Sequence, residues 1–335
     1  MDKNNRITLA HGGGGKLMAD LIGDVFLSNF SNKILNKLED AAKINIASNN
    51  IAFTTDSYTV KPLFFPGGDI GKLAVCGTAN DLAVMGAKPI AISASFIIED
   101  GFLIETLKKI VTSMAKTAKG NNIDIVTGDI KVVGKGEIDK VFINTSGIGI
   151  IHEKMKVSCK NVKVGDLVIV SGEIAEHGIS ILNVREKLGL KPDIKSDVTC
   201  VFPLVDKCLV LSKHIHAMRD PTRGGMVSVL NEIAKASNVG IKIFEDMVPV
   251  KKQVASACEI LGMDPLNIAN EGKVVLFVSP KGAKNILSRL RKTSLCRKAS
   301  IIGEVTKEKN VYLETKLGTK RLLPLLDGEA LPRIC

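Results

Sequence analysis

Between residues 41 and 305 the chain alternates short apolar runs with longer stretches whose apolar residues recur every three or four positions. In the clearest such stretch, 103–118, one stripe collects Leu103, Leu107, Ile110, Val111, Met114 and Ala118. That period is typical of an amphipathic helix, and the short runs are typical of strands. A chain of 335 residues with this alternation can build two α/β or α+β domains, with mixed sheets packed against helices.

The individual elements follow from these two patterns. Strands are expected at 51–55, 90–96, 123–127, 141–151, 167–170, 241–244, 274–278 and 299–305. Helices are expected at 16–30, 69–85, 103–118, 177–188, 203–217, 225–237, 251–262 and 280–292. We expect four parts: a glycine-rich arm with one helix (1–40), a first domain (41–152), a second domain (153–315) and a tail (316–335). The tail is polar and contains two prolines, so we expect it, like the N-terminal arm, to be flexible.

Composition argues against several classes of protein. The seven cysteines include no C-x-x-C pair, which argues against a zinc site or a disulfide framework and favours the cytoplasm. The N-terminus lacks the apolar segment of a signal peptide, and the apolar run 82–98 is interrupted by Lys88 and Pro89, so we expect no membrane span. The net charge of +11 would suit nucleic acid, but aromatic residues make up only 4% and tryptophan is absent. We therefore expect an anionic nucleotide or an acidic partner protein instead.

The chain ends in Cys335. A terminal cysteine cannot easily belong to a core, because its own α-carboxylate must stay solvated. A prenylation signal would need three residues after the cysteine. Two interpretations remain from position alone: a frayed end that happens to close with cysteine, or a reactive thiol on an arm that can be loaded and moved.

A run of glycines, Gly12, Gly13, Gly14 and Gly15, precedes Lys16 and the first expected helix. Backbone N–H groups of such a run can close on phosphate oxygens at a helix N-terminus. The run is not a Walker A loop, because Leu17 stands where the magnesium-binding hydroxyl would be. A flexible linker is the alternative interpretation.

Three aspartates interrupt apolar surroundings in the first domain. Asp56 and Asp129 follow expected strands, and Asp81 lies inside an apolar helical segment. An unpaired charge in such a place costs several kcal/mol, about 2–7 for a polar group alone. Oxygen ligands from separate elements suit magnesium bound to a triphosphate. The sequence therefore predicts a phosphate–magnesium site here, although a single aspartate of this kind would more often be a cap or turn residue.

The second domain offers further polar loops. The sequence Arg219 to Gly225 (RDPTRGG) precedes a helix and brings Asp220 and Arg223, both suited to phosphate or metal. It could equally be a capping loop. Glu271 in the sequence NEG precedes an apolar strand and could face a cleft or sit in a simple turn. His177 could contact nucleotide or begin a helix, whereas His214 and His216 are expected to be solvated.

These motifs together resemble one family. The glycine run with Lys16, TTDSY, NDLAVMGA, TGDIKVV, EHG, RDPTRGG, NEG and the terminal PRIC are similar to the HypE family of hydrogenase maturation factors. That family belongs to the aminoimidazole ribonucleotide synthetase-like (PurM-like) superfamily of ATP-dependent enzymes, and the resemblance covers nearly the whole chain. All motifs except PRIC are shared in part with selenophosphate synthetases and thiamine-phosphate kinases. Selenophosphate synthetases carry a reactive cysteine before the glycine run, and this chain has none there.

The resemblance implies a fold and an activity. It implies a two-domain PurM-like fold, a homodimer, and ATP with Mg²⁺ as cofactors. A HypF-like carbamoyltransferase would load a carbamoyl group on Cys335, and the enzyme would use ATP to dehydrate the S-carboxamide to an S-cyanate. The cyanide would pass to an iron-bearing HypC–HypD complex for the [NiFe]-hydrogenase centre. The alternatives are a small-molecule phosphotransferase of the same superfamily and a non-catalytic thiol carrier.

The resemblance also assigns roles to residues. Magnesium would be bound by Asp56, Asp81, Asp129 and Asp220. ATP would be bound by Gly12, Gly13, Gly14, Gly15, Lys16, Thr55, Asn80, Gly128 and Arg223. Cys335 would be the carrier, Lys131 would orient the carboxamide or stabilise its phosphorylated form, and Glu271 would be the general base. His177 is a second, weaker candidate for the base.

Overall fold

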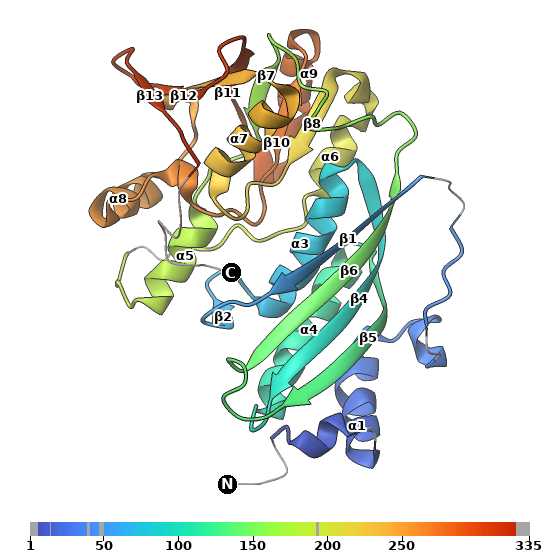
Figure 1. Ribbon diagram of the computed structural model, residues 1–335. Helices are drawn as coiled ribbons and strands as arrows, with labels where there is room; N and C mark the ends of the chain where they lie inside the picture. The colour runs from blue at the N-terminus through green and yellow to red at the C-terminus, as the bar shows by residue number, and fades with distance from the viewer. Residues whose placement is uncertain (1–5, 14, 39–40, 47–49, 192–193, 326–335) are drawn as a thin grey trace.

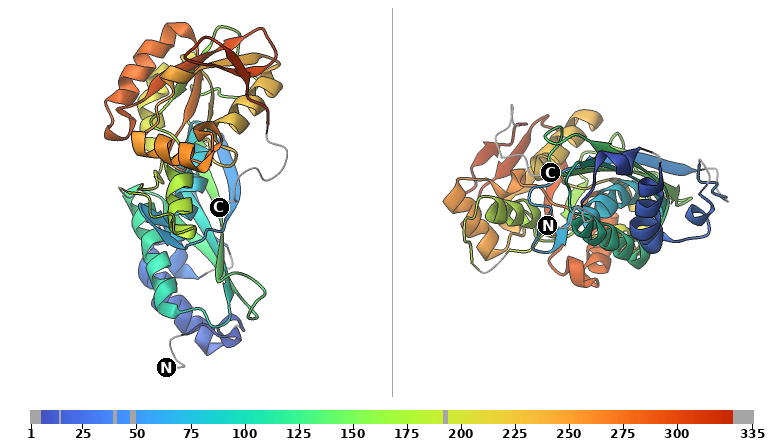
Figure 2. Two further views of the ribbon diagram at one scale, coloured as in Figure 1. Left: turned by 90° about the vertical axis from the view of Figure 1, so that its left-hand side faces the viewer. Right: turned by 90° about the horizontal axis from the view of Figure 1, so that it is seen from below.

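The computed structural model describes residues 6–13, 15–38, 41–46, 50–191 and 194–325. The predicted carrier Cys335 and the glycine Gly14 therefore lie outside the described residues. Figure 1 shows two α/β parts, each built on its own large sheet, and Figure 2 shows that they are joined end to end. The predicted fold class, α/β or α+β with mixed sheets packed against helices, is confirmed.

The first part contains a four-stranded sheet in the order β1-β6-β4-β5. Its strands are β1 (Ile51–Tyr58), β4 (Ala87–Glu99), β5 (Asp124–Val133) and β6 (Val141–Ile151). Only β4 and β5 are parallel. Two helices, α3 (Ile70–Val84) and α4 (Ile104–Gly120), pack against one face of this sheet. The apolar stripe expected on 103–118 faces the core, where Leu107, Ile110 and Met114 are fully buried.

The other face of this sheet has no described helix against it (Figure 1). Side chains alternate between the two faces of a strand, so Ile51 and Phe53 of β1 point to this uncovered face. Phe53 is 68% exposed there. Large exposed apolar side chains on an otherwise regular sheet indicate a surface that can pack against another protein surface.

A helical segment precedes this sheet and packs on β5. It comprises η2 (Leu9–Gly12), α1 (Lys16–Leu21), the π-helical turn η3 (Ile22–Leu27) and α2 (Ser28–Phe30), followed by η4 (Leu35–Lys37). The expected helix over 16–30 is confirmed, with one wide turn in its middle. Phe26 makes an edge-to-face contact with Phe96 of β4, with ring centroids 5.0 Å apart. This contact joins the helical segment to the core of the sheet.

The second part contains a seven-stranded sheet in the order β13-β12-β9-β11-β7-β10-β8. Its strands are β7 (Leu167–Val170), β8 (Ile215–Arg219), β9 (Gly240–Phe244), β10 (Val275–Val278), β11 (Ser300–Thr306), β12 (Val311–Glu314) and β13 (Lys320–Leu322). Its helices are α5 (Glu176–Arg185), α6 (Phe202–Cys208), α7 (Gly225–Ser237), α8 (Lys252–Leu261) and α9 (Pro280–Arg291).

The first part also contains a short antiparallel pair of strands, β2 (Phe64–Phe65) and β3 (Gly68–Asp69).

Two expectations for this part were wrong. The expected helix 203–217 ends as α6 and continues through a 3-10 segment, η5 (Leu209–His214), into strand β8, which pairs with β10. The expected tail from residue 316 is also wrong in its first part, because β13 pairs with β12 and Leu323 is buried. Leu323 gains from this burial and its N–H donates to Val311 C=O at 2.9 Å, whereas Leu322 is 62% exposed.

The two predicted histidines of this region are not simply solvated. His214 Nδ1 lies 2.8 Å from Ser279 Oγ, and His216 Nδ1 lies 2.7 Å from Asp166 Oδ2. Both contacts join neighbouring elements of the second part, so these histidines hold the fold together.

The two parts are also joined through a shared core. The C-terminal end of α3, at Ala83 and Val84, packs with Val201 and Leu204 of the second part. The segment 194–201, which leads into α6, crosses between the parts and donates Ser196 N–H to Pro66 C=O at 2.8 Å. The bounds 41–152 and 153–315 stay a prediction as domain limits. Among the described residues, no helix combines the length and apolarity that a membrane crossing needs.

Candidate functional site

A group of acidic side chains gathers where the end of α3 meets β1 and the second part. Tyr58 on β1 contacts Thr78 of α3, with 3.1 Å between the two hydroxyl oxygens. Asp56 lies two residues from Tyr58 on the same strand, and therefore also faces α3. Thr54 Oγ1, on that face as well, donates to Asp81 Oδ2 at 2.8 Å. Asp56 and Asp81 are thus brought to one side of the sheet, as predicted.

Asp220 comes to this group from the second part. A cavity of about 350 Å³ is lined by Thr54, Asp81, Arg219, Asp220 and Thr222, together with apolar residues of β1 and α3. Burial, followed by the nearby charge of Asp81, raises the pKa of Asp220 to about 7. Burial also raises the pKa of Asp81. The positive charge around these two carboxyl groups is therefore too small to offset their burial.

Arg223 supplies one cation to the group. Its Nη2 lies 3.5 Å from Asp56 Oδ1, and its side chain is 70% exposed. Arg219 instead pairs with Glu232 at 2.7 Å. The ion pair between Arg223 and Asp56 joins the two parts of the molecule, and the predicted closeness of the loop 219–225 to the first part is confirmed.

Glycine is required where this loop enters α7. Gly224 and Gly225 have φ values of +71° and +61°, in the left-handed region. A Cβ on Gly225 would lie 2.6 Å from Leu266 C=O, so only glycine lets the loop approach that backbone. Asn270 holds the loop from the other side, donating its Nδ2 to Pro221 C=O at 3.1 Å.

Glu271 is buried close to the acidic group. Glu271 is only 7% exposed. Burial raises the pKa of Glu271 well above its ordinary value, and the charges of Asp220, Asp197, Asp56 and Asp81 add to this effect. Without a bound cation, the Glu271 carboxyl is therefore favoured in its protonated form.

His177 takes a structural place. It is fully buried, and its Nδ1 lies 2.8 Å from Ser196 Oγ. The edge of its ring meets Phe65, with centroids 5.7 Å apart. Burial lowers the pKa of His177 to about 4. A neutral ring packed this way does not favour the predicted role of His177 as a second base.

Asn80 also differs from its predicted role in ATP binding. Its Nδ2 donates to Thr199 C=O at 3.0 Å and to Glu271 C=O at 3.2 Å, and its Oδ1 accepts from Val201 N–H at 2.8 Å. Both amide hydrogens are therefore used, and the residue is 1% exposed. Asn80 joins α3 to the second part instead of facing the cavity.

Asp129 does not lie with the other aspartates. Along the sheet its register partners are Ser95, Asn144 and Ser57, whereas Asp56 is in register with Thr145. Neighbouring residues in register point to the same face, so Asp129 faces the uncovered side and Asp56 faces α3. Strand β5 is also three strands away from β1, about 14 Å at a spacing of about 4.8 Å. The prediction that one chain brings Asp129 to the site of Asp56 and Asp81 was wrong, because β5 continues past residue 127.

The other predicted ATP residues are divided in the same way. Lys131 follows Asp129 on the uncovered face, and Thr55 of β1 also lies on that face. Gly12 packs on β5, where an added Cβ would lie 3.0 Å from Val132 Cβ. Gly13, Gly15 and Lys16 continue from there into α1. A cavity of about 430 Å³ between this helical segment and β5 is lined mainly by apolar side chains, with Thr127, Gly128 and Asp129 at its border.

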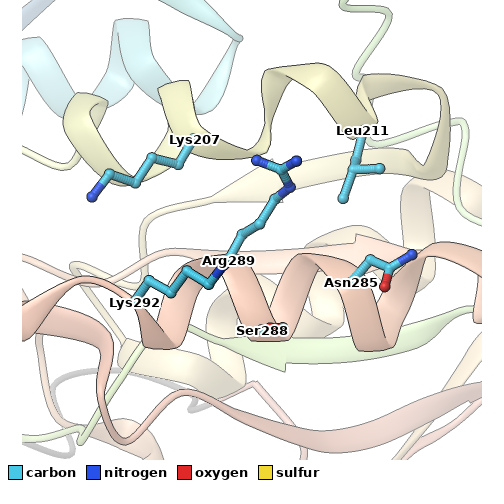
Figure 3. A pocket seen from close by; sticks show the side chains of 6 residues that line it. All are labelled: Lys207, Leu211, Asn285, Ser288, Arg289 and Lys292. Carbon is cyan, nitrogen blue, oxygen red and sulfur yellow. The ribbon is translucent and has the colours of Figure 1, made fainter.

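A further pocket lies away from these residues. Figure 3 shows it between α6 with η5 and helix α9, and it is lined by Lys207, Leu211, Asn285, Ser288, Arg289 and Lys292. Residues 280–298 contain seven lysines and arginines and no acidic residue. Much of the net positive charge of the chain is therefore concentrated on α9 and the turn that follows it.

Reasoning from the sequence missed several buried ionic residues. Lys273 Nζ lies 2.9 Å from Asp197 Oδ2 and 3.8 Å from Glu176 Oε2, and Lys251 pairs with Glu176 at 2.5 Å. Glu176 is the first residue of the EHG motif and Lys273 directly follows the NEG motif, and those positions were the available signal. Among the described residues, no three His, Cys, Asp or Glu side chains are already arranged to hold a metal ion.

Comparison with known proteins identifies the family. Residues 38–151 match the family model of the AIR synthase related protein N-terminal domain, and residues 163–316 match that of its C-terminal domain. The chain is 47% identical to carbamoyl dehydratase HypE of Escherichia coli. The aligned 336 residues cover 99% of this chain and 100% of that protein. The chain belongs to the HypE family. A HypE of Bradyrhizobium diazoefficiens, also named a carbamoyl dehydratase, is 44% identical over 336 residues, with 99% and 97% of the two chains covered.

Solved structures agree with this assignment. A HypE in complex with ATP superposes with a TM-score of 0.94 at 42% identity, covering 98% of this chain and 99% of its own. The chain in a HypE–HypF complex gives 0.82 at 49% identity, with 93% and 100% covered. A thiamine-monophosphate kinase at 18% identity, TM-score 0.62, shares the fold alone. The predictions of a HypE, of a PurM-like fold and of a hydrogenase maturation enzyme of the carbamoyl dehydratase type are confirmed.

Proposed function

We propose that this chain dehydrates an S-carboxamide carried on its own Cys335 to an S-cyanate, with ATP as the phosphate donor. The observation that carries the proposal is the acidic group at the junction of the two parts, in a chain of the HypE family. Asp56, Asp81, Asp220 and Glu271 meet there beside Arg223. A relative of known structure binds ATP. Cys335 lies ten residues beyond Leu325, a reach of at most about 35 Å.

A magnesium ion bound to phosphates would bring together carboxylates that are not arranged to hold a metal ion by themselves. Burial and mutual repulsion raise the pKa of Asp81, Asp220 and Glu271, and a bound cation would offset this repulsion. Carboxylate oxygens are the ligands that Mg²⁺ takes in proteins. We assign Asp56, Asp81 and Asp220 as its ligands. When bound, the ion would neutralise charge on the transferring phosphoryl group.

In this proposal, a second copy of the chain supplies Asp129, Lys131 and the glycine run with Lys16 to the nucleotide site. Asp129 and Lys131 lie on the uncovered face of the four-stranded sheet, which also exposes Phe53. Packing two such faces together in a homodimer would bury these apolar side chains. It would also give each acidic group access to the β5 edge of the other copy, with its glycine run and Lys16. The homodimer and the ATP contacts of Gly12, Gly13, Gly14, Gly15, Lys16, Thr55 and Gly128 are part of this proposal.

The proposed reaction has two steps. The carboxamide oxygen attacks the γ-phosphorus, ADP leaves, and one N–H proton goes to a base. Loss of inorganic phosphate from carbon and of the second N–H proton then forms the C≡N bond on sulfur. Glu271 is the proposed base, because its carboxyl lies beside the acidic group, where a bound cation would favour its ionised form. Arg223 would contact the phosphates, and Lys131 would stabilise the phosphorylated carboxamide.

Two partner proteins would act before and after the dehydration. A carbamoyltransferase of the HypF type would load Cys335, and a HypE of known structure is found in complex with HypF. An iron-bearing HypC–HypD complex would accept the cyanide. We place the reaction in the cytoplasm and include no nucleic acid or membrane partner.

Mass spectrometry of the C-terminal peptide tests this function. After incubation with a HypF-type carbamoyltransferase, its carbamoyl donor and ATP, the peptide should carry first a carbamoyl group and then a thiocyanate. Cys335→Ala should bind ATP as the wild-type chain does and form neither product. Formation of a phosphorylated small molecule with the peptide unmodified would instead favour the phosphotransferase.

A further inference from the structure

The peptide that carries Glu271 is held by a buried carboxylate. Asp197 Oδ1 accepts the N–H of Glu271 at 3.1 Å, and Asp197 Oδ2 accepts the N–H of Gly272 at 3.2 Å. The Asp197 side chain is 2% exposed. A carboxylate has acceptors on both oxygens, so it can bind two successive N–H groups at once. This contact fixes the direction of the peptide at Glu271.

The buried carboxylate is balanced by a buried lysine. Lys273 Nζ donates to Asp197 Oδ2 at 2.9 Å, and its side chain is 9% exposed. Glu176 and Lys251 extend the pair into a chain of four charges. Burial works against the charged form, but Lys273 and His177 bring the pKa of Asp197 below its ordinary value, so Asp197 is ionised at neutral pH. Ion pairs of this kind are costly to bury and are weak evidence for a contribution to stability.

The carbonyl of Glu271 is held by one residue from each part. Glu271 C=O accepts from Asn80 Nδ2 at 3.2 Å and from Thr199 N–H at 3.3 Å. Thr199 and Asp197 belong to one segment, which is itself tied to the first part through Ser196 and Val201. Glu271 is therefore anchored before and after its own Cα, at the junction that also holds Asp56 and Asp81.

We propose that Asp197 is a positioning residue for the dehydration step, acting through the backbone of Glu271. This inference rests on the proposed function, in which Glu271 is the base. Asp197 contacts the backbone N–H groups of Glu271 and Gly272 and pairs with Lys273. It is not one of the proposed magnesium ligands, which are Asp56, Asp81 and Asp220. Its function is to hold the Glu271 carboxyl at the distance from the carboxamide that proton transfer needs. A displacement of about 1 Å can lower a rate about 100-fold.

Two single variants separate positioning from stability. Asp197→Asn loses one acceptor, so the N–H of Gly272 faces an amide hydrogen, and Lys273 loses its anionic partner. Lys273→Met removes the ion pair and leaves both hydrogen bonds from the backbone to Asp197 in place. Both variants should unfold at a lower temperature than the wild-type chain. In single-turnover dehydration of the carbamoylated chain, Asp197→Asn should be slowed about 10- to 100-fold and Lys273→Met less than about threefold. ATP affinity measured by calorimetry should stay within about twofold for both.

A double variant covers the case in which Asp197→Asn does not fold. Asp197→Asn with Lys273→Met removes both buried charges, so it should regain stability and keep the slow rate. Normal dehydration by this variant, or equal slowing in Lys273→Met, would overturn the positioning role. Glu271→Gln is measured in parallel: if it is fully active, the base in the proposed function is wrong. If Glu271→Gln is inactive and Asp197→Asn is normal, only the positioning inference fails.

Discussion

Replacing Asn80 tests whether this residue binds nucleotide or joins the two parts of the molecule. Asn80→Ala removes the partners of two backbone groups, the buried Val201 N–H and the partly buried Thr199 C=O. A third group, Glu271 C=O, keeps the hydrogen bond from Thr199 N–H. A buried backbone group left without a partner costs about 1–3 kcal/mol. We therefore expect the free energy of unfolding to fall by about 2–5 kcal/mol.

Urea unfolding followed by circular dichroism measures this loss. The matched control is Asn285→Ala on α9, an exposed asparagine, which should change the free energy of unfolding by less than about 0.5 kcal/mol. Calorimetric ATP affinity of Asn80→Ala, measured with magnesium below its unfolding transition, should stay within about threefold of the wild-type value. Unchanged stability with a loss of ATP binding would refute the assignment and restore Asn80 to the nucleotide site.

Three further outcomes follow from the site and the sheet. Asp81→Asn should keep the fold and lose most magnesium-dependent ATP affinity in calorimetry, whereas an unchanged affinity would remove Asp81 from the ion. The pKa of His177 is about 4 in the folded chain, below the ordinary value near 6.5, so the unfolded chain binds the proton first as pH falls. Stability should therefore decrease between about pH 6.5 and 4, and His177→Gln should show a shallower decrease in unfolding experiments across that range; an equal slope would contradict the buried neutral ring. Phe53→Lys should shift the sedimentation coefficient from a dimer to a monomer, and a dimeric variant would place the contact elsewhere.

The sequence predicted elements best where one pattern dominated. Strand 141–151 and helix 225–237 were predicted with the bounds that the structure has, because alternation and helical periodicity there are unambiguous. Residues 215–219 failed because a buried edge strand and a helix share the same short apolar pattern there.

The candidate site was predictable in its residue types but only partly in its assembly. The acidic group formed by Asp56, Asp81 and Asp220 agrees with the interpretation from motifs. The prediction for Asp129 failed because strand β5 was expected to end at residue 127. Asp129 lies within β5, and the sequence did not show that its side chain points to the uncovered face of the sheet. Asp197 had no motif around it, and its role depends on backbone contacts that form only in three dimensions.

The placement of the α3 end has a consequence for the order in which the chain is synthesised. Ala83 and Val84 of α3 complete a cluster that otherwise consists of residues from 155 onward, including Val201 and Leu204. Since the ribosome makes α3 first, this helix is available as a template when the later segment emerges. A fragment beginning after residue 152 would lack the template and leave Val201 and Leu204 exposed to water. Each part therefore depends on the other for a complete core, despite having its own sheet.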